Sequence, residues 1–438
     1  MYRSVFSGTV SASLLNDFFM NNEKEKEESQ KATDENVTKT ENVEIKKDLP
    51  LSQEAIDNKL LISAKIIERM VNLNTYEDIA KDYRFYEDPA DEFRGHEGSL
   101  LPLWTFIFEE GQGQEITGLQ WSPRYTDLFG VTYGTFDFYD NSKPGHLCLY
   151  SLKNPSFPEY ICSAWCGILC LDIHPSYPHM IVTGLYDGNI AVYNLHTRSS
   201  TPCYHSSAGQ GKHAGCVWQV CWAKDNLDGY LNFYSCSGDG RVTNWTIVKT
   251  SLWHSDELMV GFDKALTNTK GLAEDLVDGA RAIAFKPDED NKYLVGTDEG
   301  DIYLSTTEYS SAYLMTYHSH VTPINTVMWN PFYPLLFISC ASEPMVHIWH
   351  KSLSVPILSF DTGFPVGDVA WAPYSSTVFA LVTGDGGVRV YDIHLNKYRP
   401  ICKQVITSLL KFLKIVHTSV EYAFNPELHL CVSEVIYF

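Results

Sequence analysis

Apolar and polar positions between Ala164 and Leu195 alternate in short runs that predict three β-strands and two turns. Apolar residues crowd Ile168 to Ile173, a proline-flanked turn follows, and a second apolar run precedes Asp187-Gly188. The Asp-Gly pair favours a tight hairpin, because a two-residue hairpin turn needs a positive φ that glycine adopts without strain. Ile190 to Asn194 then alternates as a third strand, so this stretch has the pattern of a β-repeat unit.

The same unit recurs from about residue 100 onward. Each copy has an aromatic or apolar residue at the end of its first expected strand, and all copies but one have a proline two positions later. The spacing of roughly 42 to 63 residues between these anchors matches the length of a propeller blade. The seven anchors are Trp121, Ile173, Trp222, Phe285, Trp329, Trp371 and Phe424.

The intervals inside the copies are more regular than the overall period. An acidic residue at an expected hairpin turn follows the anchor by 14 residues in four copies and by 17 in a fifth; these acids are Asp187, Asp239, Glu299, Glu343 and Asp385. Six residues beyond the acids stand Tyr193, Trp245, Ser305, Trp349 and Tyr391. Two histidines, His213 and His320, stand nine residues before their anchors. Such fixed intervals predict an array of structural repeats.

This arrangement resembles the WD40 repeat, which has a histidine, a strand anchor, an Asp-Gly hairpin and then a Trp-Asp pair. The match is degenerate, because only Tyr391-Asp392 keeps the aspartate. The resemblance implies an all-β fold, a seven-bladed WD40 β-propeller with four-stranded antiparallel blades. The residues to which it gives a structural role are Trp121, Asp187, His213, Trp222, Asp239, Trp245, His320, Trp329, Trp349, Trp371 and Asp385.

The seventh blade is expected to be incomplete. Its hairpin acid should lie 14 residues beyond Phe424, at position 438, which is the last residue of the sequence. In WD40 propellers the N-terminal strand completes the last blade, and Leu103 to Phe108 can supply that strand here. The blade would then lack its third strand and expose a sheet edge, so we expect it to be less stable than a whole blade.

Ahead of the repeats, residues 1–50 and 51–98 differ from the β-rich region 99–438. The first region is dense in Glu, Lys, Asn and Thr, which predicts a disordered charged tail. The second predicts a helix that begins at Ser52 and either packs on the repeats or binds a partner. Candidate partner-binding residues are Leu60, Ile66, Ile67, Met70 and Val71 on this helix, and Tyr83, Arg84 and Tyr86, which could equally brace the propeller.

Composition narrows the classes of function. The formal net charge is −21 without any Lys/Arg block, which argues against nucleic-acid binding, because phosphate contacts need clustered cations. Eleven cysteines, an odd number, are scattered through strand-like segments and indicate reduced, buried thiols of a cytosolic protein. No apolar run approaches the roughly 18 residues of a membrane helix, so no membrane partner is expected.

We expect no catalytic, cofactor-binding or metal site. The C-x3-C-x3-C run that begins at Cys162 would line one face of a helix, but its pattern is that of a strand, which favours buried structural cysteines. The pairs His318/His320 and His347/His350 lack further zinc ligands at matched spacing. The Gly-Gln-Gly runs lack the Lys-Ser/Thr of a phosphate-binding loop.

The loops and linkers resemble a narrower family. Over about Lys65 to Cys402 they are similar to axonemal dynein intermediate chains of the outer-arm type, and cytoplasmic dynein intermediate chains are the near alternative. The resemblance is specific, because it includes segments that propeller folding does not require. Those segments are Ile66 to Phe93, Leu100 to Phe106, Leu149 to Tyr160, Val217 to Trp222 and Val366 to Ala380.

This resemblance implies a non-catalytic scaffold without a cofactor, located in the cytoplasm, the cytoskeleton and the axoneme of a cilium or flagellum. Its propeller would dock on a dynein heavy chain, and the helix around Leu60 to Val71 would carry a roadblock-type light chain. A second intermediate chain and, through the complex, the microtubule doublet are further implied partners. The family usually has a longer N-terminal region than the roughly 50 residues found here, so its upstream motifs are not expected.

Two other functions compete with this interpretation. A generic WD40 adaptor in another complex would share the repeats but not the linker segments. A propeller enzyme would need convergent acids, histidines or metal ligands at inner-strand ends, and the sequence pattern shows none.

Overall fold

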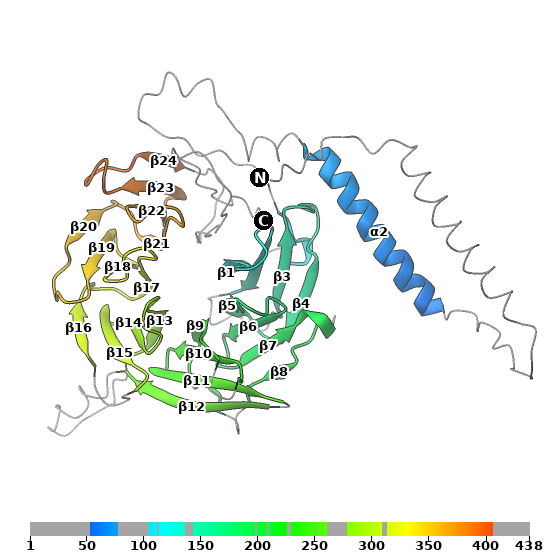
Figure 1. Cartoon of the computed structure of the whole chain (residues 1–438), viewed down its shortest axis with the longest axis horizontal. Helices are drawn as coiled ribbons and strands as arrows, with labels where there is room; N and C mark the ends of the chain where they lie inside the picture. Colours follow the sequence, from blue (N-terminus) through cyan, green and yellow to red (C-terminus); the bar gives the residue numbers. More distant parts are fainter. Residues whose placement is uncertain are drawn as a thin grey trace, which may run out of the picture. The chain divides into compact units, whose positions relative to one another are not determined.

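The structure is a computed structural model of the 438-residue chain (Figure 1). Compact units are Met1–Ala64 and Lys65–Phe438, and their boundary falls within helix α2 (Gln53–Thr75). Among the described residues, no helix combines the length and apolar character needed to cross a membrane. The described residues are 53–77, 104, 106–111, 114–135, 143–197, 199–207, 209, 211–225, 229–249, 251–260, 278–308 and 313–405.

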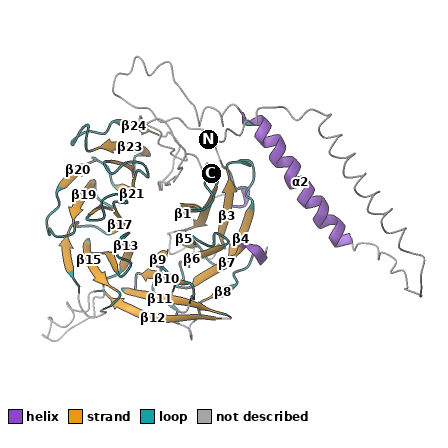
Figure 2. Ribbon diagram, in the orientation of Figure 1, coloured by secondary structure: helices purple, strands orange, loops and turns teal. Residues whose placement is uncertain are grey.

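Strands dominate the unit Lys65–Phe438 (Figure 2), with short 3-10 turns at η1 (Glu109–Gly111) and η3 (Leu195–Thr197). The strands of the described residues form six four-stranded antiparallel sheets, and in each sheet consecutive strands are neighbours. We number these sheets blade one to blade six in chain order. Because every connection joins neighbouring antiparallel strands, each blade can form from one short continuous segment.

Blade one comprises β1 (Glu115–Trp121), β2 (Leu128–Gly134), β3 (Gly145–Ser151) and β4 (Tyr160–Ala164). Blade two comprises β5 (Ile168–Ile173), β6 (Met180–Leu185), β7 (Ile190–Asn194) and β8 (Tyr204–His205). Blade three comprises β9 (Val217–Trp222), β10 (Asn232–Ser237), β11 (Arg241–Val248) and β12 (Ser251–Met259).

Blade four comprises β13 (Ala280–Phe285), β14 (Lys292–Thr297), β15 (Asp301–Thr306) and β16 (Met315–His318). Blade five comprises β17 (Ile324–Trp329), β18 (Leu336–Ala341), β19 (Met345–His350) and β20 (Leu358–Asp361). Blade six comprises β21 (Val366–Trp371), β22 (Val378–Thr383), β23 (Gly387–Asp392) and β24 (Cys402–Val405).

The first strands of successive blades contact one another around a common centre, which is the arrangement of a β-propeller (Figure 1). The predicted all-β propeller is therefore confirmed. The blade count needs correction, because the described residues form six blades rather than the predicted seven. The seventh anchor, Phe424, lies outside the described residues, which end at Val405. The expected tail 1–50 also lies outside them.

The sequence intervals correspond to fixed places in each blade. Six predicted anchors are the last residues of the first strands: Trp121, Ile173, Trp222, Phe285, Trp329 and Trp371. The five predicted acids lie in the turns between second and third strands: Asp187, Asp239, Glu299, Glu343 and Asp385. The 14-residue interval is thus a turn, a six-residue strand and the start of the next turn, as between β5 and β7.

Most of the hydrophobic core of the described residues lies between neighbouring blades. One cluster joins Leu147 of blade one to Ile168 and Ile181 of blade two, and all three side chains are fully buried. Another joins Leu294 of blade four to Trp349 of blade five. Full burial of one such side chain contributes about 1.5–3 kcal/mol. Because both faces of an interior blade are covered, the second strands β6 and β10 are buried at every position.

Two glycine turns connect one blade to the loop of the next. Gly188 has φ 85° and Gly300 has φ 94°, a region that favours glycine. A Cβ added at either glycine would lie 2.3 Å from the carbonyl oxygen of His213 or His320, respectively. The same histidines donate their backbone N–H to the glycine carbonyls at 3.1 Å. Each of these predicted histidines is therefore held in place by the preceding blade.

Candidate functional sites

Helix α2 has a polar side and an apolar side. Lys65, Arg69 and Asn72 follow one another at intervals of four and three residues, which places them on one face. The predicted partner-binding residues lie on the other side and are between 53% and 63% exposed: Leu60, Ile66, Ile67, Met70 and Val71. Scattered exposed apolar residues are ordinary, but a contiguous apolar helix face marks an interaction surface.

The contacts of α2 within the unit Lys65–Phe438 come from its polar face. The guanidinium of Arg69 donates to both carboxylate oxygens of Glu159, at 2.8 and 2.5 Å. This hydrogen-bonded pairing raises the pKa of Arg69. Asn72 donates through Nδ2 to the side-chain oxygen of Asn154 at 2.6 Å. Because these residues turn toward the propeller, the apolar face is directed away from these contacts.

The other predicted linker contacts cannot be placed. Tyr83, Arg84 and Tyr86 lie outside the described residues. Their proposed contact role therefore stays a prediction.

The predicted tryptophan anchors connect neighbouring blades. In three of them, the indole Nε1 donates a hydrogen bond to a backbone oxygen in the first strand of the preceding blade. These contacts are Trp222 to Asp172 at 3.0 Å, Trp329 to Ala284 at 3.1 Å and Trp371 to Met328 at 3.4 Å. The fourth, Trp121, is equally buried, and its Nε1 has no hydrogen-bond partner in the described part of the chain. These residues are built into the packing and do not face a common site.

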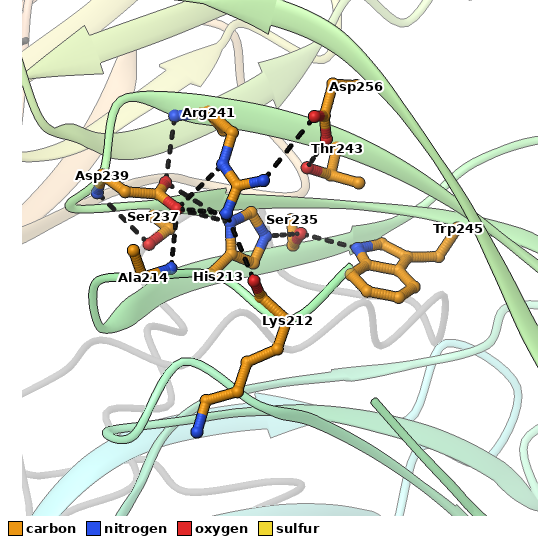
Figure 3. A network of polar contacts seen from close by, with 10 residues as sticks. All are labelled: Lys212, His213, Ala214, Ser235, Ser237, Asp239, Arg241, Thr243, Trp245 and Asp256. Atoms are coloured by element: carbon orange, nitrogen blue, oxygen red, sulfur yellow. Dashed lines mark hydrogen bonds and ion pairs between the residues drawn. The ribbon is translucent and has the colours of Figure 1, made fainter. Parts of the chain in front are cut away.

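Blade three contains a buried polar network (Figure 3), in which the side chain of Ser235 lies between two rings. Trp245 donates through Nε1 to Ser235 Oγ at 2.8 Å, and the same oxygen lies 2.7 Å from Nε2 of His213. Nδ1 of His213 lies 3.3 Å from both carboxylate oxygens of Asp239. The four residues connect the strands β10 and β11 with the loop before β9.

The carboxylate of Asp239 is held by several further donors. The backbone N–H groups of Ala214 and Arg241 donate to it at 2.9 and 3.1 Å, and the Arg241 guanidinium donates at 2.8 and 3.0 Å. Burial alone would raise the pKa of Asp239, but the hydrogen bonds, that from His213 first, lower it below its ordinary value. An ionised carboxylate with its donors in place stabilises this turn.

Blade five repeats this network with one changed acid. Trp349 Nε1 donates to Ser339 Oγ at 3.0 Å, and that oxygen lies 2.9 Å from His320 Nε2. His320 Nδ1 lies 2.5 Å from Oε1 of Glu343. Burial lowers the pKa of His320, against the opposing influence of Glu343.

Two of the other predicted acids, Asp187 and Asp385, are held by other donors. In blade two, Asp187 accepts a hydrogen bond from Trp165 Nε1 at 2.8 Å and from the backbone N–H of Asn189 at 3.0 Å. In blade six, Asp385 accepts from the Thr383 hydroxyl and, at 3.1 Å, from the backbone N–H of Gly387. Burial opposes the effect, but these donors lower the pKa of both carboxyl groups. Both acids fix a turn.

The chemistry available to the buried cysteines is limited. Burial raises the pKa of Cys162 to about 11 and that of Cys166 to about 12, so both remain protonated thiols at neutral pH. A protonated thiol is a poor nucleophile and a poor metal ligand. Within the described ranges, the group with metal-ligand geometry is His320, Glu343 and His347. Sequence reasoning missed this group, because it paired histidines that are adjacent in the chain.

In the part of the chain that the structure describes, six antiparallel meanders surround a common centre and two of them contain a His–Ser–Trp–acid network, which defines a WD-repeat β-propeller. No model of a known protein family matches the chain. Individual relatives do match it. The ciliary dynein intermediate chain 2 of Heliocidaris crassispina is 42% identical over 428 residues, which cover 97% of this chain and 60% of the relative.

Two further relatives are also dynein intermediate chains. The axonemal dynein intermediate chain 1 of Mus musculus is 44% identical over 430 residues, covering 97% of this chain and 60% of its own length. The 78 kDa intermediate chain of the flagellar outer arm of Chlamydomonas reinhardtii is 36% identical over 376 residues, 84% of this chain and 54% of its own. Over most of its length the chain is thus homologous to axonemal dynein intermediate chains, and it spans about 60% of the length of the first two relatives.

Proposed function

We propose that this chain is a non-catalytic intermediate chain that scaffolds an outer-arm axonemal dynein and so serves ciliary or flagellar motility. The observation that carries the proposal is the identity of 42–44% across 97% of the chain to a ciliary and an axonemal dynein intermediate chain. The outer-arm assignment is supported by the Chlamydomonas relative, whose name places it in the flagellar outer arm. The chain then resides in the axoneme, after passage through the cytoplasm, as part of the cytoskeleton.

The proposed partners divide between the propeller and the helix. The propeller docks on a dynein heavy chain, and a second intermediate chain and the microtubule doublet are reached through the complex. The apolar face of α2 receives a roadblock-type light chain, which is supported by the exposure of Ile66, Ile67 and Met70. This division corresponds to a tail at 1–50, a helical light-chain-binding segment at 51–98 and a propeller at 99–438.

Co-purification from ciliated cells tests the proposed complex. The tagged full chain, extracted gently, should retain a dynein heavy chain, while an unrelated WD-repeat propeller with the same tag should not. Retention of a heavy chain of a cytoplasmic dynein would replace the axonemal assignment. Absence of any heavy chain would refute the scaffold function and favour a generic adaptor.

A matched pair of substitutions tests the helix. Ile67→Lys introduces a charge on the exposed apolar face, whereas Glu68→Lys introduces the same side chain at the neighbouring position, toward the polar side. We expect Ile67→Lys to remove the light chain from the purified complex and to leave the heavy chain bound. Equal light-chain content in the two variants would contradict the assignment of this face.

A further inference from the structure

Blade five brings three side chains with metal-ligating atoms to one place. His320 lies in the loop between β16 and β17, Glu343 in the turn between β18 and β19, and His347 on β19. One ligand atom from each lies within 4.8 Å of the other two. His320 and His347 also stand ring to ring, with centroids 4.7 Å apart. Two imidazoles and a carboxylate at such distances are a ligand set that suits a divalent transition metal.

The strand register explains this convergence. His347 on β19 is paired with Ser339 on β18, and Ser339 is the residue that contacts His320 Nε2. The imidazole of His347 therefore lies beside the network and is not one of its four members. All three side chains are at least partly buried, which shields them from competing water.

Blade three shows what the same position contains without a second histidine. Thr243 stands two residues before Trp245, as His347 stands two residues before Trp349, and it donates to Asp256 at 2.8 Å. Two residues after the acid, blade three has Arg241, whose guanidinium neutralises Asp239, whereas blade five has Met345. The carboxylate of blade five thus lacks this guanidinium and gains a second imidazole.

We propose that His320, Glu343 and His347 form a binding site for one divalent transition-metal ion, with Zn²⁺ the best fit to two nitrogens and a carboxylate oxygen. The inference does not depend on the proposed dynein function. The bound ion would join a loop, a turn and a strand of blade five. A water molecule would complete a tetrahedral shell.

The surrounding hydrogen bonds accommodate this ion. His347 contacts Ser359 Oγ through Nδ1 at 2.8 Å, which orients the ring and leaves Nε2 for the metal. His320 can bind the ion through Nδ1 when the single proton of its ring is on Nε2. The Nε2–H group then donates to Ser339 Oγ. Ser339 Oγ then accepts from both His320 and Trp349, so the change of tautomer needs no net uptake or release of a proton. Such outer contacts commonly orient metal-bound histidines.

Calorimetric titration of the full, chelator-treated chain with Zn²⁺ tests the proposal, and visible absorption of the Co²⁺ form reports the ligand geometry. His347→Thr installs the residue type that blade three has at this position. His318→Thr is the matched control, because His318 is an exposed histidine that contacts Asp301 at 2.8 Å. We expect one ion per chain in the wild type and in His318→Thr, and at least about 100-fold weaker binding in His347→Thr.

A second variant separates loss of the site from loss of the fold. Glu343→Gln keeps a hydrogen-bond acceptor beside His320 and removes the anionic ligand, so it should also weaken binding while the circular dichroism of the chain stays unchanged. Absence of stoichiometric binding to the wild type would overturn the site. So would equal affinity in wild type and His347→Thr, which would place the ion on other side chains.

Discussion

Blades three and five contain the same four-part network around different neighbours. In both, a tryptophan and a histidine meet a serine, and the histidine meets an acid. In blade three the acid is satisfied by Arg241 and by backbone N–H groups. In blade five it is approached by a second imidazole, His347. The comparison teaches that the repeat fixes the positions of the four network residues, whereas the residues two places away from the tryptophan and from the acid decide the local chemistry.

The largest expected effect removes the tryptophan that both networks share. Trp245→Ala and Trp349→Ala each delete a fully buried side chain, so each should lower the free energy of unfolding by about 3–5 kcal/mol. Urea denaturation followed by tryptophan fluorescence measures both. The similar packing of the two rings, stacked on Phe233 and Phe337 respectively, predicts similar losses. A loss confined to one variant would show that the two blades are not equivalent in their cores.

Unlike the two tryptophans, the two acids should contribute different amounts to the free energy of unfolding. Asp239→Asn removes a carboxylate that receives charge-assisted bonds from Arg241, and should cost about 1.5–3 kcal/mol. Glu343→Gln in the metal-free chain keeps an acceptor beside His320 but replaces the charged carboxylate with a neutral amide, and should cost only about 1 kcal/mol. The same denaturation experiment compares them. An equal or larger loss for Glu343→Gln would mean that the arginine contributes little to blade three.

The repeat positions of these residues could be predicted from the sequence, because turn glycines and strand lengths repeat at fixed intervals. The propeller fold and six of the anchors follow from that regularity, as with Trp222 and Trp329 at strand ends. The meeting of His320 with His347 could not be predicted, because it depends on the pairing of β18 with β19. The sequence suggested pairs of histidines that are neighbours in the chain, such as His318 and His320. In the structure His318 is exposed and His320 is buried, so the two side chains do not form a pair.

The contacts between blades could not be predicted from the sequence either. The close approach of Gly188 to the backbone of His213 joins different repeats, and no interval within one repeat encodes it. The polar contacts of α2 are a similar case, since Arg69 and Glu159 are 90 residues apart. The apolar face of α2, in contrast, could be predicted from the sequence, because helical periodicity alone separates the two faces of a helix.

Acid should reduce the contribution of Asp239 to stability. The folded pKa of this carboxyl is lowered by its donors, although burial opposes them, whereas the unfolded value is about 3.9. The unfolded chain therefore binds the proton more tightly, so the stabilisation is fully present above about pH 5 and is lost as the pH falls toward the folded pKa. We expect the difference in unfolding free energy between wild type and Asp239→Asn to shrink below about pH 4. A difference that stays constant from pH 7 to pH 3 would contradict this assignment.

The smallest expected effect converts blade five toward blade three. Met345→Arg places a guanidinium two residues after Glu343, as Arg241 stands two residues after Asp239. Because Met345 is half-buried, the new ion pair should stabilise the metal-free chain by only about 0.5–1 kcal/mol, measured by urea denaturation. The same cation occupies the carboxylate and repels a divalent ion, so Zn²⁺ affinity should fall as stability rises. These opposite signs come from one side chain. A variant that gained stability and kept its Zn²⁺ affinity would show that Glu343 is not a ligand.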